Sequence, residues 1–424
     1  MDSPEASYGR GGKRRGGKRC VGCLLYPVSC TLTGMGDGVT EADGTDEGNP
    51  SVARPTIDGL TGIRIVAATW VLAEHFSGPL FALLPVSRHA TAWIASGYLG
   101  VEVFFVLSGF IISYNYADRL KRWNGQAYRQ FLTLRFARLY PVHLITLLAV
   151  GALVLGARAV NFELNTQSKY GPLSFVMNVL MFQAVPPAEA WNAPAWSISA
   201  EAGAYVAFPL LAWLLIRATT RFRALAGVLA GLTFTLVSVW LIALSGYLSD
   251  TPYPGTWVRV VGEFTAGCFL WAYWQRFGRR GPTWDLVAVG AFLGAGVILW
   301  QTQPVGPRNF LALPLLALLV VAVASSTGVV ARVMGCRWMQ YGGRISYSLY
   351  MTHVIVLMIV GKILRWDDFV DAALPVRLAI LGVYFGVVIG VAAATYHWVE
   401  VPGRMLIRRR VGVRRRPVEA SVTS

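Results

Sequence analysis

The sequence predicts an all-α, polytopic membrane protein. Of its 424 residues, 55% are hydrophobic and 14% are charged, whereas soluble domains carry about 25% charged residues. The mean hydropathy is +0.50, and long apolar runs recur with short breaks between them. Because a helix needs about 20 apolar residues to cross the hydrocarbon core, these runs have the length of membrane spans.

We expect about ten transmembrane helices plus a short interfacial or re-entrant helix. The short piece, 172–186, is bracketed by prolines and is too short to span. In chain order, the expected spans are 60–81, 93–114, 139–157, 194–216, 224–245, 257–274, 284–300, 309–327, 347–364 and 376–396.

The two ends of the chain differ in composition from the membrane domain, which we place at 56–405. Residues 1–55 contain clustered Gly and charged residues, which predicts a disordered cytoplasmic extension. Residues 406–424 form a basic tail. Cys20 and Cys23 have the spacing of a metal or redox pair, but no second pair follows, so we expect free thiols and no metal site.

The formal net charge of +16 would suggest nucleic acid as the partner of a soluble protein. In a membrane protein it is explained first by the excess of Lys and Arg in cytoplasmic loops. With ten spans, the basic clusters fall in alternate loops and in the tail. We therefore expect a multi-pass plasma-membrane protein with both termini cytoplasmic, in contact with anionic lipids and not with nucleic acid.

The first apolar run carries two polar residues on one helix face. Arg64 and His75 are eleven positions apart, which leaves an angular offset of about 20° and a separation of about 16 Å along the axis. Ionisable residues inside a membrane are costly and favour a functional role. A His can accept a proton from a hydroxyl near pH 7. A snorkelling Arg with a structural His is the alternative interpretation.

Two further motifs precede or enter the third span. The run 104–112 contains Ser108 and Gly109, which permit close helix approach and predict a packing face. Arg135 and Arg138 lie at i and i+3 at the expected cytoplasmic mouth. Such a pair suits bidentate recognition of phosphate, although an ordinary positive-inside anchor would have the same sequence.

A carboxylate lies near the start of the fourth span. Glu201 follows the run Trp196-Ser-Ile-Ser-Ala, and Tyr205 is one turn further along. A carboxylate inside the membrane needs a partner. Glu201 is therefore expected to orient His75, to bind the hydroxyls of an acceptor, or to form a structural ion pair.

The ninth span begins with polar residues. Tyr347, Tyr350 and His353 are spaced i, i+3 and i+6, which predicts a loose polar stripe beginning beside Ser346. Glu400 closes the tenth span and is expected to pair with a nearby Arg.

Taken in order, these motifs resemble the membrane acyltransferase-3 family over about residues 57–405. Each is weak alone, and their order carries the match. The matching elements are Arg64-x10-His75, the Phe-Phe-x-Leu-Ser-Gly-Phe run, Arg135-x-x-Arg138-x-x-Pro141, Trp196-Ser-x-Ser-x-Glu201, Ser346-Tyr347-x-x-Tyr350-x-x-His353 and Glu400-x-Pro402.

The resemblance implies transfer of an acyl group, often acetyl, from acyl-coenzyme A to a hydroxyl. Acceptors in the family include sugars of surface polysaccharides, lipopolysaccharide, peptidoglycan, glycolipids and macrolides. The serine-hydrolase-like domain of one branch is missing from the sequence, which favours a glycolipid, a lipopolysaccharide-type sugar or a small glycoside. Acyl-coenzyme A is expected as a co-substrate, with no permanently bound cofactor.

The same resemblance implies roles for individual residues. His75 is the catalytic base, Arg64 is its essential companion, and Glu201 is expected at the catalytic centre. Arg135 and Arg138 would hold the phosphates of coenzyme A. The substrate pocket is expected to include Ser346, Tyr347, Tyr350 and His353.

The expected mechanism is direct attack of the acceptor hydroxyl, deprotonated by His75, on the thioester carbonyl. Arg64 or a tyrosine of the ninth span would stabilise the oxyanion. A second option is an acyl-enzyme formed on Ser346 or His75. A different class is a glycolipid or polysaccharide transporter or flippase with a buried polar path, but the sequence shows no inverted repeat of broken helices.

Overall fold

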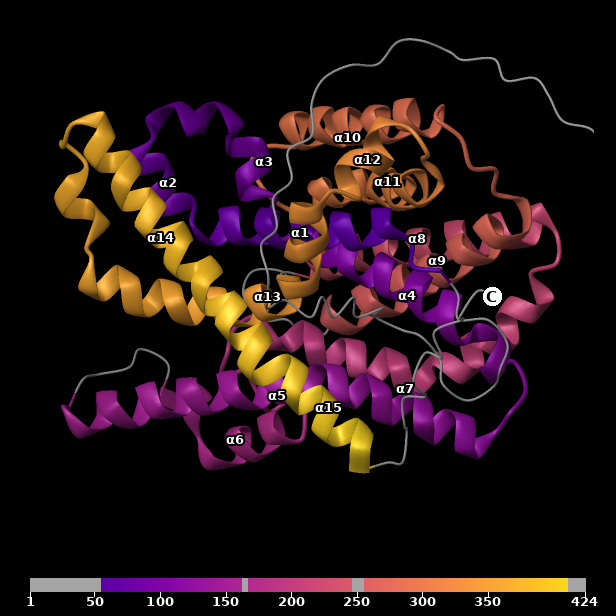
Figure 1. The fold of residues 1–424 in the computed structure, drawn as a ribbon, viewed down its shortest axis with the longest axis horizontal. Coiled ribbons are helices and arrows are strands. Elements are labelled where there is room, and N and C mark those ends of the chain that lie inside the picture. Colours follow the sequence, from indigo (N-terminus) through magenta and orange to yellow (C-terminus); the bar gives the residue numbers. More distant parts are fainter. Residues whose placement is uncertain (1–54, 162–166, 246–254, 411–424) are drawn as a thin grey trace, which may run out of the picture. The chain divides into compact units, whose positions relative to one another are not determined.

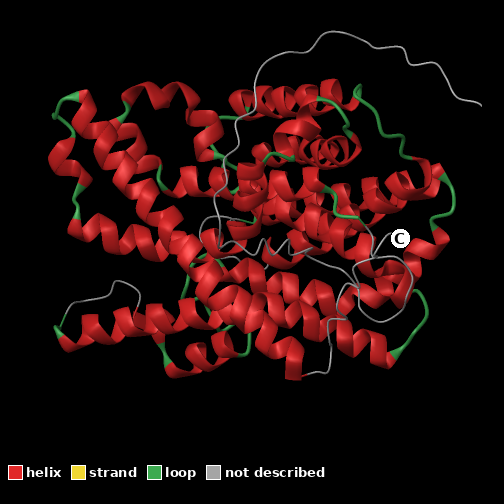
Figure 2. Ribbon diagram, in the orientation of Figure 1, coloured by secondary structure: helices red, strands yellow, loops and turns green. Residues whose placement is uncertain are grey.

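The computed structural model describes residues 55–161, 167–245 and 255–410. Within these ranges the chain is built from helices and contains no β-strand, which confirms the all-α class (Figure 2). The predicted disordered extension, with Cys20 and Cys23, lies almost entirely outside the described residues. The end of the basic tail, 411–424, also lies outside them.

The helices follow the apolar runs of the sequence. The long helices are α1 (Asp58–His75), α4 (Leu99–Leu120), α5 (Gly125–Ala159), α7 (Ala195–Arg217), α8 (Arg221–Leu244), α9 (Gly255–Phe277), α10 (Trp284–Gln301), α11 (Leu313–Ser325), α13 (Arg337–Ile363) and α14 (Leu374–Thr395). The short helices are α2 (Ser77–Leu83), α3 (Thr91–Ala95), α6 (Pro172–Val179), α12 (Val329–Met334) and α15 (Val401–Arg410).

Eight described helices are long and apolar enough to cross a membrane, and the bent pair α1–α2 would make a ninth. The remaining span of the expected ten, 257–274, is α9. This helix has the length of a span, but Arg259 and Glu263 lower its hydropathy. Because α9 packs against α4, α7, α8 and α11, these charges face protein instead of lipid. The piece 172–186 contains only the eight-residue α6, as its length predicted.

The expected continuous first span, 60–81, is wrong. Helix α1 ends at His75, and α2 leaves it at an angle of 71°. Pro79 explains the break, because a helical proline lacks an N–H and clashes with the carbonyl four residues earlier, which here belongs to His75. His75 therefore lies at the bend.

The third span is also longer than expected. Instead of beginning near residue 139, α5 runs unbroken through Pro141 for 35 residues, with Asn124 accepting hydrogen bonds from the first turn. Arg135 and Arg138 thus lie on an established helix. In Figure 1, α15 crosses α5, and the two helices are in contact close to Gly403 and Pro141.

The centre of the bundle is a close crossing of α4 and α9. A Cβ added at Gly109 would lie 2.1 Å from the carbonyl oxygen of Phe264, and one at Gly267 would lie 2.0 Å from that of Val106. Only glycine permits this approach at either position. The packing face predicted for the run 104–112 is therefore confirmed at Gly109.

Candidate active site

A cavity opens between α1, α4, α5, α7 and α13. It encloses about 850 Å³, counting its open mouth. Seven of the nine predicted site residues line it: Arg64, Arg135, Arg138, Glu201, Ser346, Tyr347 and Tyr350. These residues come from four helices, so the bundle brings together motifs that are up to 286 positions apart in the sequence.

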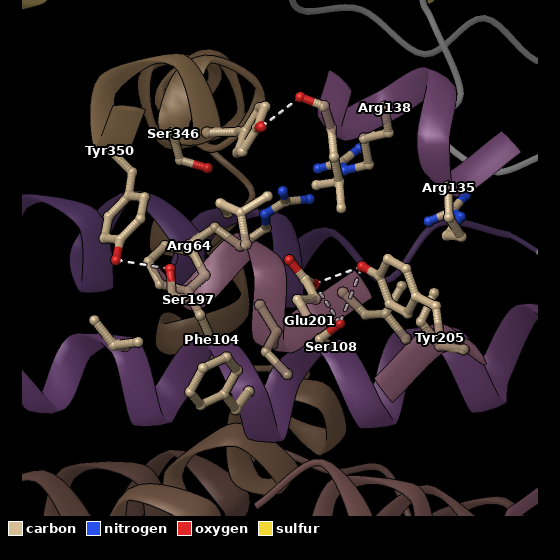
Figure 3. Close-up of a pocket in the computed structure, with 18 of the residues that line it drawn as sticks. Arg64, Phe104, Ser108, Arg135, Arg138, Ser197, Glu201, Tyr205, Ser346 and Tyr350 are labelled. Carbon is tan, nitrogen blue, oxygen red and sulfur yellow. Dashed lines mark hydrogen bonds between the residues drawn. The ribbon is translucent and has the colours of Figure 1, made fainter. Parts of the chain in front are cut away.

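The cavity has two chemically different ends (Figure 3). Arg135 and Arg138 lie at one end, whereas Phe104 and Tyr350 lie at the other. The lining follows α4 from Asn115 back to Val101, which is about 21 Å of helix axis. The cavity is therefore long, with a cationic end and an aromatic end.

At the cationic end, the side chains of Arg135 and Arg138 line the cavity and are largely buried. Their exposed fractions are 8% for Arg135 and 9% for Arg138. Arg135 Nη2 donates to the hydroxyl of Tyr116 at 3.0 Å, and its guanidinium also lies 5.1 Å from the centre of that ring. The hydroxyl of Tyr347 donates to the carbonyl of Leu139, next to Arg138, at 2.6 Å. The contacts with Tyr116 position the Arg135 guanidinium, and the Tyr347 hydrogen bond ties α13 to α5 beside Arg138.

In the middle of the cavity, Glu201 is bound by hydroxyl groups. Its Oε1 accepts hydrogen bonds from Ser108 Oγ at 2.6 Å and from the Tyr205 hydroxyl at 2.5 Å (Figure 3). One of the three roles predicted for Glu201 was to orient His75. The structure does not show this contact, because the hydrogen-bond partners of Glu201 are Ser108 on α4 and Tyr205, one turn along α7. Ser108 and Tyr205 are contacts that the sequence analysis did not foresee.

At the aromatic end, Tyr350 is fixed by its hydroxyl. This group lies 2.9 Å from Ser197 Oγ and donates to the carbonyl of Pro194 at 3.1 Å. Ser346 lines the cavity nearby, but its hydroxyl donates to the carbonyl of Gly343 at 2.9 Å. The Ser346 proton is therefore used within the helix.

The two predicted histidines do not line the cavity, and for His353 this corrects its expected place in the substrate pocket. His353 lies one turn beyond Tyr350 on α13 and is 1% exposed. Its ring meets that of His75 edge to face, with the centres 4.8 Å apart. The ring of Tyr350 is 5.9 Å from that of His353. The histidine pair is thus separated from the cavity by the Tyr350 side chain.

The contacts of both histidine rings are made at Nδ1. His75 Nδ1 lies 3.0 Å from the Val71 carbonyl oxygen and 2.7 Å from Glu74 Oε2, and since both oxygens are acceptors, Nδ1 carries a proton. His353 Nδ1 faces the Tyr350 carbonyl at 2.7 Å, and its Nε2 has no hydrogen-bond partner among the described residues. The His75 side chain is 35% exposed, so it is accessible from the side of the α1–α2 bend.

A second buried cluster escaped the sequence analysis. Glu102 on α4 forms an ion pair with Arg259 on α9, and Glu263 lies one turn further along α9. Both carboxylates are 0% exposed, and the Arg259 guanidinium stacks over Trp196, 4.8 Å from its centre. The available signal was the i, i+4 spacing of Arg259 and Glu263 within an apolar run. None of the three lines the cavity.

At the end of the last span, the predicted pairing of Glu400 with a nearby arginine is confirmed. Glu400 pairs with Arg404 at 2.7 Å and accepts a hydrogen bond from Ser348 at 2.7 Å. This arrangement ties the π-helical turn Tyr396–Glu400 to α13. Within the described residues, no three His, Cys, Asp or Glu side chains are grouped so that they could hold a metal ion.

Similarity to known proteins agrees with this architecture. Acyltransferase MdmB of Streptomyces mycarofaciens is 27% identical over 336 residues, which cover 73% of this chain and 80% of that protein. O-acetyltransferase OatA of Staphylococcus aureus is 22% identical over 375 residues, which cover 82% of this chain but 57% of OatA. The chain therefore corresponds to little more than half of OatA. No solved structure is significantly similar to it.

The family model described as an acyltransferase domain matches residues 57–397. This range contains the cavity, the histidine pair and all the helices from α1 to α14. The chain therefore belongs to the acyltransferase-3 family.

Proposed function

We propose that this protein is an integral membrane O-acyltransferase that moves an acyl group from acyl-coenzyme A to a hydroxyl of a carbohydrate-bearing or macrolide acceptor. The observation that carries the proposal is a long cavity with two arginines at one end and, one helical turn beyond its other end, a pair of histidines. A phosphate-bearing, thioester-terminated donor fits that order of groups.

The donor is oriented by charge. Arg135 and Arg138 suit phosphate, because guanidinium groups form paired, charge-assisted hydrogen bonds with its oxygens. The pantetheine arm would follow α4 past Ser108 and Ile111, whose side chains line the cavity. About 21 Å of helix axis separates the two ends of the lining, so the thioester would reach the region of Phe104 and Tyr350.

In the proposed reaction, His75 Nε2 takes the proton of the acceptor hydroxyl as the oxygen attacks the thioester carbonyl. Glu74 and the Val71 carbonyl hold the ring in the required tautomer and stabilise the imidazolium that forms. The tetrahedral intermediate expels the coenzyme A thiolate, which receives the proton from His75. Arg64 and the Tyr350 hydroxyl are candidates for stabilising the oxyanion.

Donor and acceptor would approach from different sides. The donor occupies the cavity, and the acceptor reaches His75 from the α1–α2 bend, where the side chain is exposed. Tyr350 and His353 stand between the two compartments, so one of these side chains must move for the reacting groups to meet. Catalytic contacts often tighten only in the complex with substrate.

The acceptor and the topology are part of the proposal. The name O-acetyltransferase, which OatA carries, supports transfer of acetyl to oxygen. We favour a glycolipid, a lipopolysaccharide-type sugar or a macrolide as the acceptor, as the family resemblance implies. Because acyl-coenzyme A is made in the cytoplasm, the arginine end would face the cytoplasm, with both termini on the same side of the plasma membrane.

The test is release of free thiol from acetyl-coenzyme A by the detergent-purified protein, compared with its His75→Ala and Arg138→Ala variants. We expect the unaltered protein to release thiol slowly and His75→Ala to release none. Arg138→Ala should reach the rate of the unaltered protein only at a higher concentration of acetyl-coenzyme A. Arg217→Ala, at an exposed position outside the cavity, is the matched control and should behave like the unaltered protein. Equal release by all four proteins would contradict the roles proposed for His75 and Arg138. Binding of glycolipid without any thiol release would contradict the whole proposal and favour a transporter.

A further inference from the structure

On the assumption that acyl-coenzyme A is the donor, we infer that Phe104 sets the upper length of the acyl group, and that the group transferred is short. Phe104 lines the aromatic end of the cavity, where the thioester would lie. Two further lining residues at this end are apolar or aromatic: Val101 lies one turn earlier on α4, and Phe105 packs on Trp196 with ring centres 6.2 Å apart.

Phe104 and Tyr350 form a wall at this end. Their ring centres are 6.1 Å apart and their planes make an angle of 59°. Tyr350 is 7% exposed and is held by both Ser197 and the Pro194 carbonyl. Figure 3 shows the two rings at the opposite end of the cavity from Arg135 and Arg138. An acyl chain that extends from the thioester would therefore meet aromatic surface.

The backbone behind Phe104 cannot move back to make room. A Cβ added at Gly100 would lie 2.6 Å from the carbonyl oxygen of Ala67 on α1, and one at Gly109 would lie 2.1 Å from that of Phe264 on α9. These contacts fix α4 on both sides of Phe104. Packed interiors resist displacement, so the volume of the side chain decides how much space the acyl group has.

The charge distribution disfavours the reverse orientation of the donor. A phosphate beside Val101 and Phe104 would be removed from water at the end of the cavity that lacks the paired arginines Arg135 and Arg138, which is costly. With the phosphates on the arginines, every added methylene extends the donor toward Phe104. A poorly accommodated methylene costs about 1–3 kcal/mol in a close-fitting pocket, or roughly 10- to 200-fold in rate.

The experiment compares thiol release from acetyl-, butyryl- and octanoyl-coenzyme A by the full chain in detergent. We expect the unaltered protein to prefer acetyl, and Phe104→Ala to raise the octanoyl-to-acetyl ratio of kcat/KM at least about tenfold. The control is Ile111→Ala, which enlarges the cavity on the same face of α4 about 10 Å nearer the arginines. It should keep the ratio of the unaltered protein.

Two further variants keep the inference testable if Phe104→Ala does not fold. Phe104→Leu should raise the ratio less, and Val101→Phe should lower the butyryl-to-acetyl ratio by filling the same end. An unchanged ratio in all folded variants that consume acetyl-coenzyme A would overturn the inference and leave the proposed function standing. Absence of thiol release from every donor, in the unaltered protein as well, would overturn both.

Discussion

The protein places charged side chains inside the membrane in two different ways. In the open cluster, Arg135, Arg138 and Glu201 line a cavity, and Arg135 and Glu201 form the hydrogen bonds with hydroxyl groups described above. In the closed cluster, Glu102 and Arg259 pair directly, with Glu263 one turn from Arg259, and none of the three lines that cavity. The difference teaches that a buried charge indicates a ligand site only where space for the ligand adjoins it.

The physical reason is desolvation. Charges taken out of water must be compensated, either by one another or by a ligand. The closed cluster is compensated by the ion pair between α4 and α9 and by the ring of Trp196 over Arg259. In the open cluster, the Arg135 guanidinium contacts the hydroxyl and ring of Tyr116, and both Arg135 and Arg138 line the cavity, where a ligand could contact them. The closed cluster should therefore determine stability, and the open cluster should determine binding.

The largest effect on activity should come from a residue in neither cluster. We expect His75→Ala to lower kcat by about 10²- to 10⁴-fold, because a general base is lost, with little change in thermal stability. Thiol-release kinetics and the unfolding temperature in detergent measure the two quantities. His89→Ala, which removes an exposed histidine from the Pro85–Ala90 turn, is the control. If the His75→Ala variant is active, His75 is not the general base, and that role would belong to a residue that lines the cavity.

The largest effect on stability should come from the closed cluster. Glu102→Ala removes the carboxylate that pairs with Arg259 and leaves Glu263 as the remaining carboxylate of the cluster, which should lower the free energy of unfolding by up to about 3–5 kcal/mol. The unfolding temperature in detergent should fall clearly. The double variant Glu102→Leu with Arg259→Met removes both charges and should recover much of the loss. If Glu102→Ala is as stable as the unaltered protein, the closed cluster is not a structural element.

A smaller effect is expected from a conservative change in the open cluster. Arg135→Lys keeps the positive charge but loses the planar fork and its stacking on Tyr116. We expect KM for acetyl-coenzyme A to rise about 10-fold with kcat nearly unchanged, since one charge-assisted hydrogen bond contributes about 1.5–3 kcal/mol. The same substitution at Arg217, outside the cavity, should leave KM unchanged. A fall in kcat alone would place Arg135 in the reaction instead of in donor binding.

The smallest effect should follow from Glu201→Gln. The amide oxygen can still accept hydrogen bonds from Ser108 and Tyr205, so only the charge is removed. We expect a change of a few-fold in kcat/KM, about 1 kcal/mol or less, and an unchanged unfolding temperature. Loss of activity comparable to that of His75→Ala would show that Glu201 takes part in the chemistry.

Much of the fold was readable from the sequence because span length and hydropathy are local properties. The long helices match the expected runs, and Glu400 finds its arginine within one turn. Errors arose where a single residue or a neighbouring helix decided the outcome. Pro79 broke the first span, and α5 continued through Pro141, so the third helix begins at Gly125 instead of near residue 139.

The candidate site was predicted residue by residue but not as an arrangement. Periodicity placed Tyr347, Tyr350 and His353 on one loose stripe, yet the structure divides them between the cavity wall and the histidine pair. Ser108 and the closed cluster were missed because their roles depend on partners in other helices. Such pairings cannot be obtained from the spacing of residues within one run.

The sequence by itself determined that the protein is a helical, multi-pass membrane protein, and it carries the motifs of its family in order. Only the tertiary structure decided which charges face a cavity, which pair with each other, and that His75 lies at a bend against His353. The reason is physical. Hydrophobic burial acts on each segment according to its own composition, whereas the compensation of a buried charge depends on which helix packs beside it.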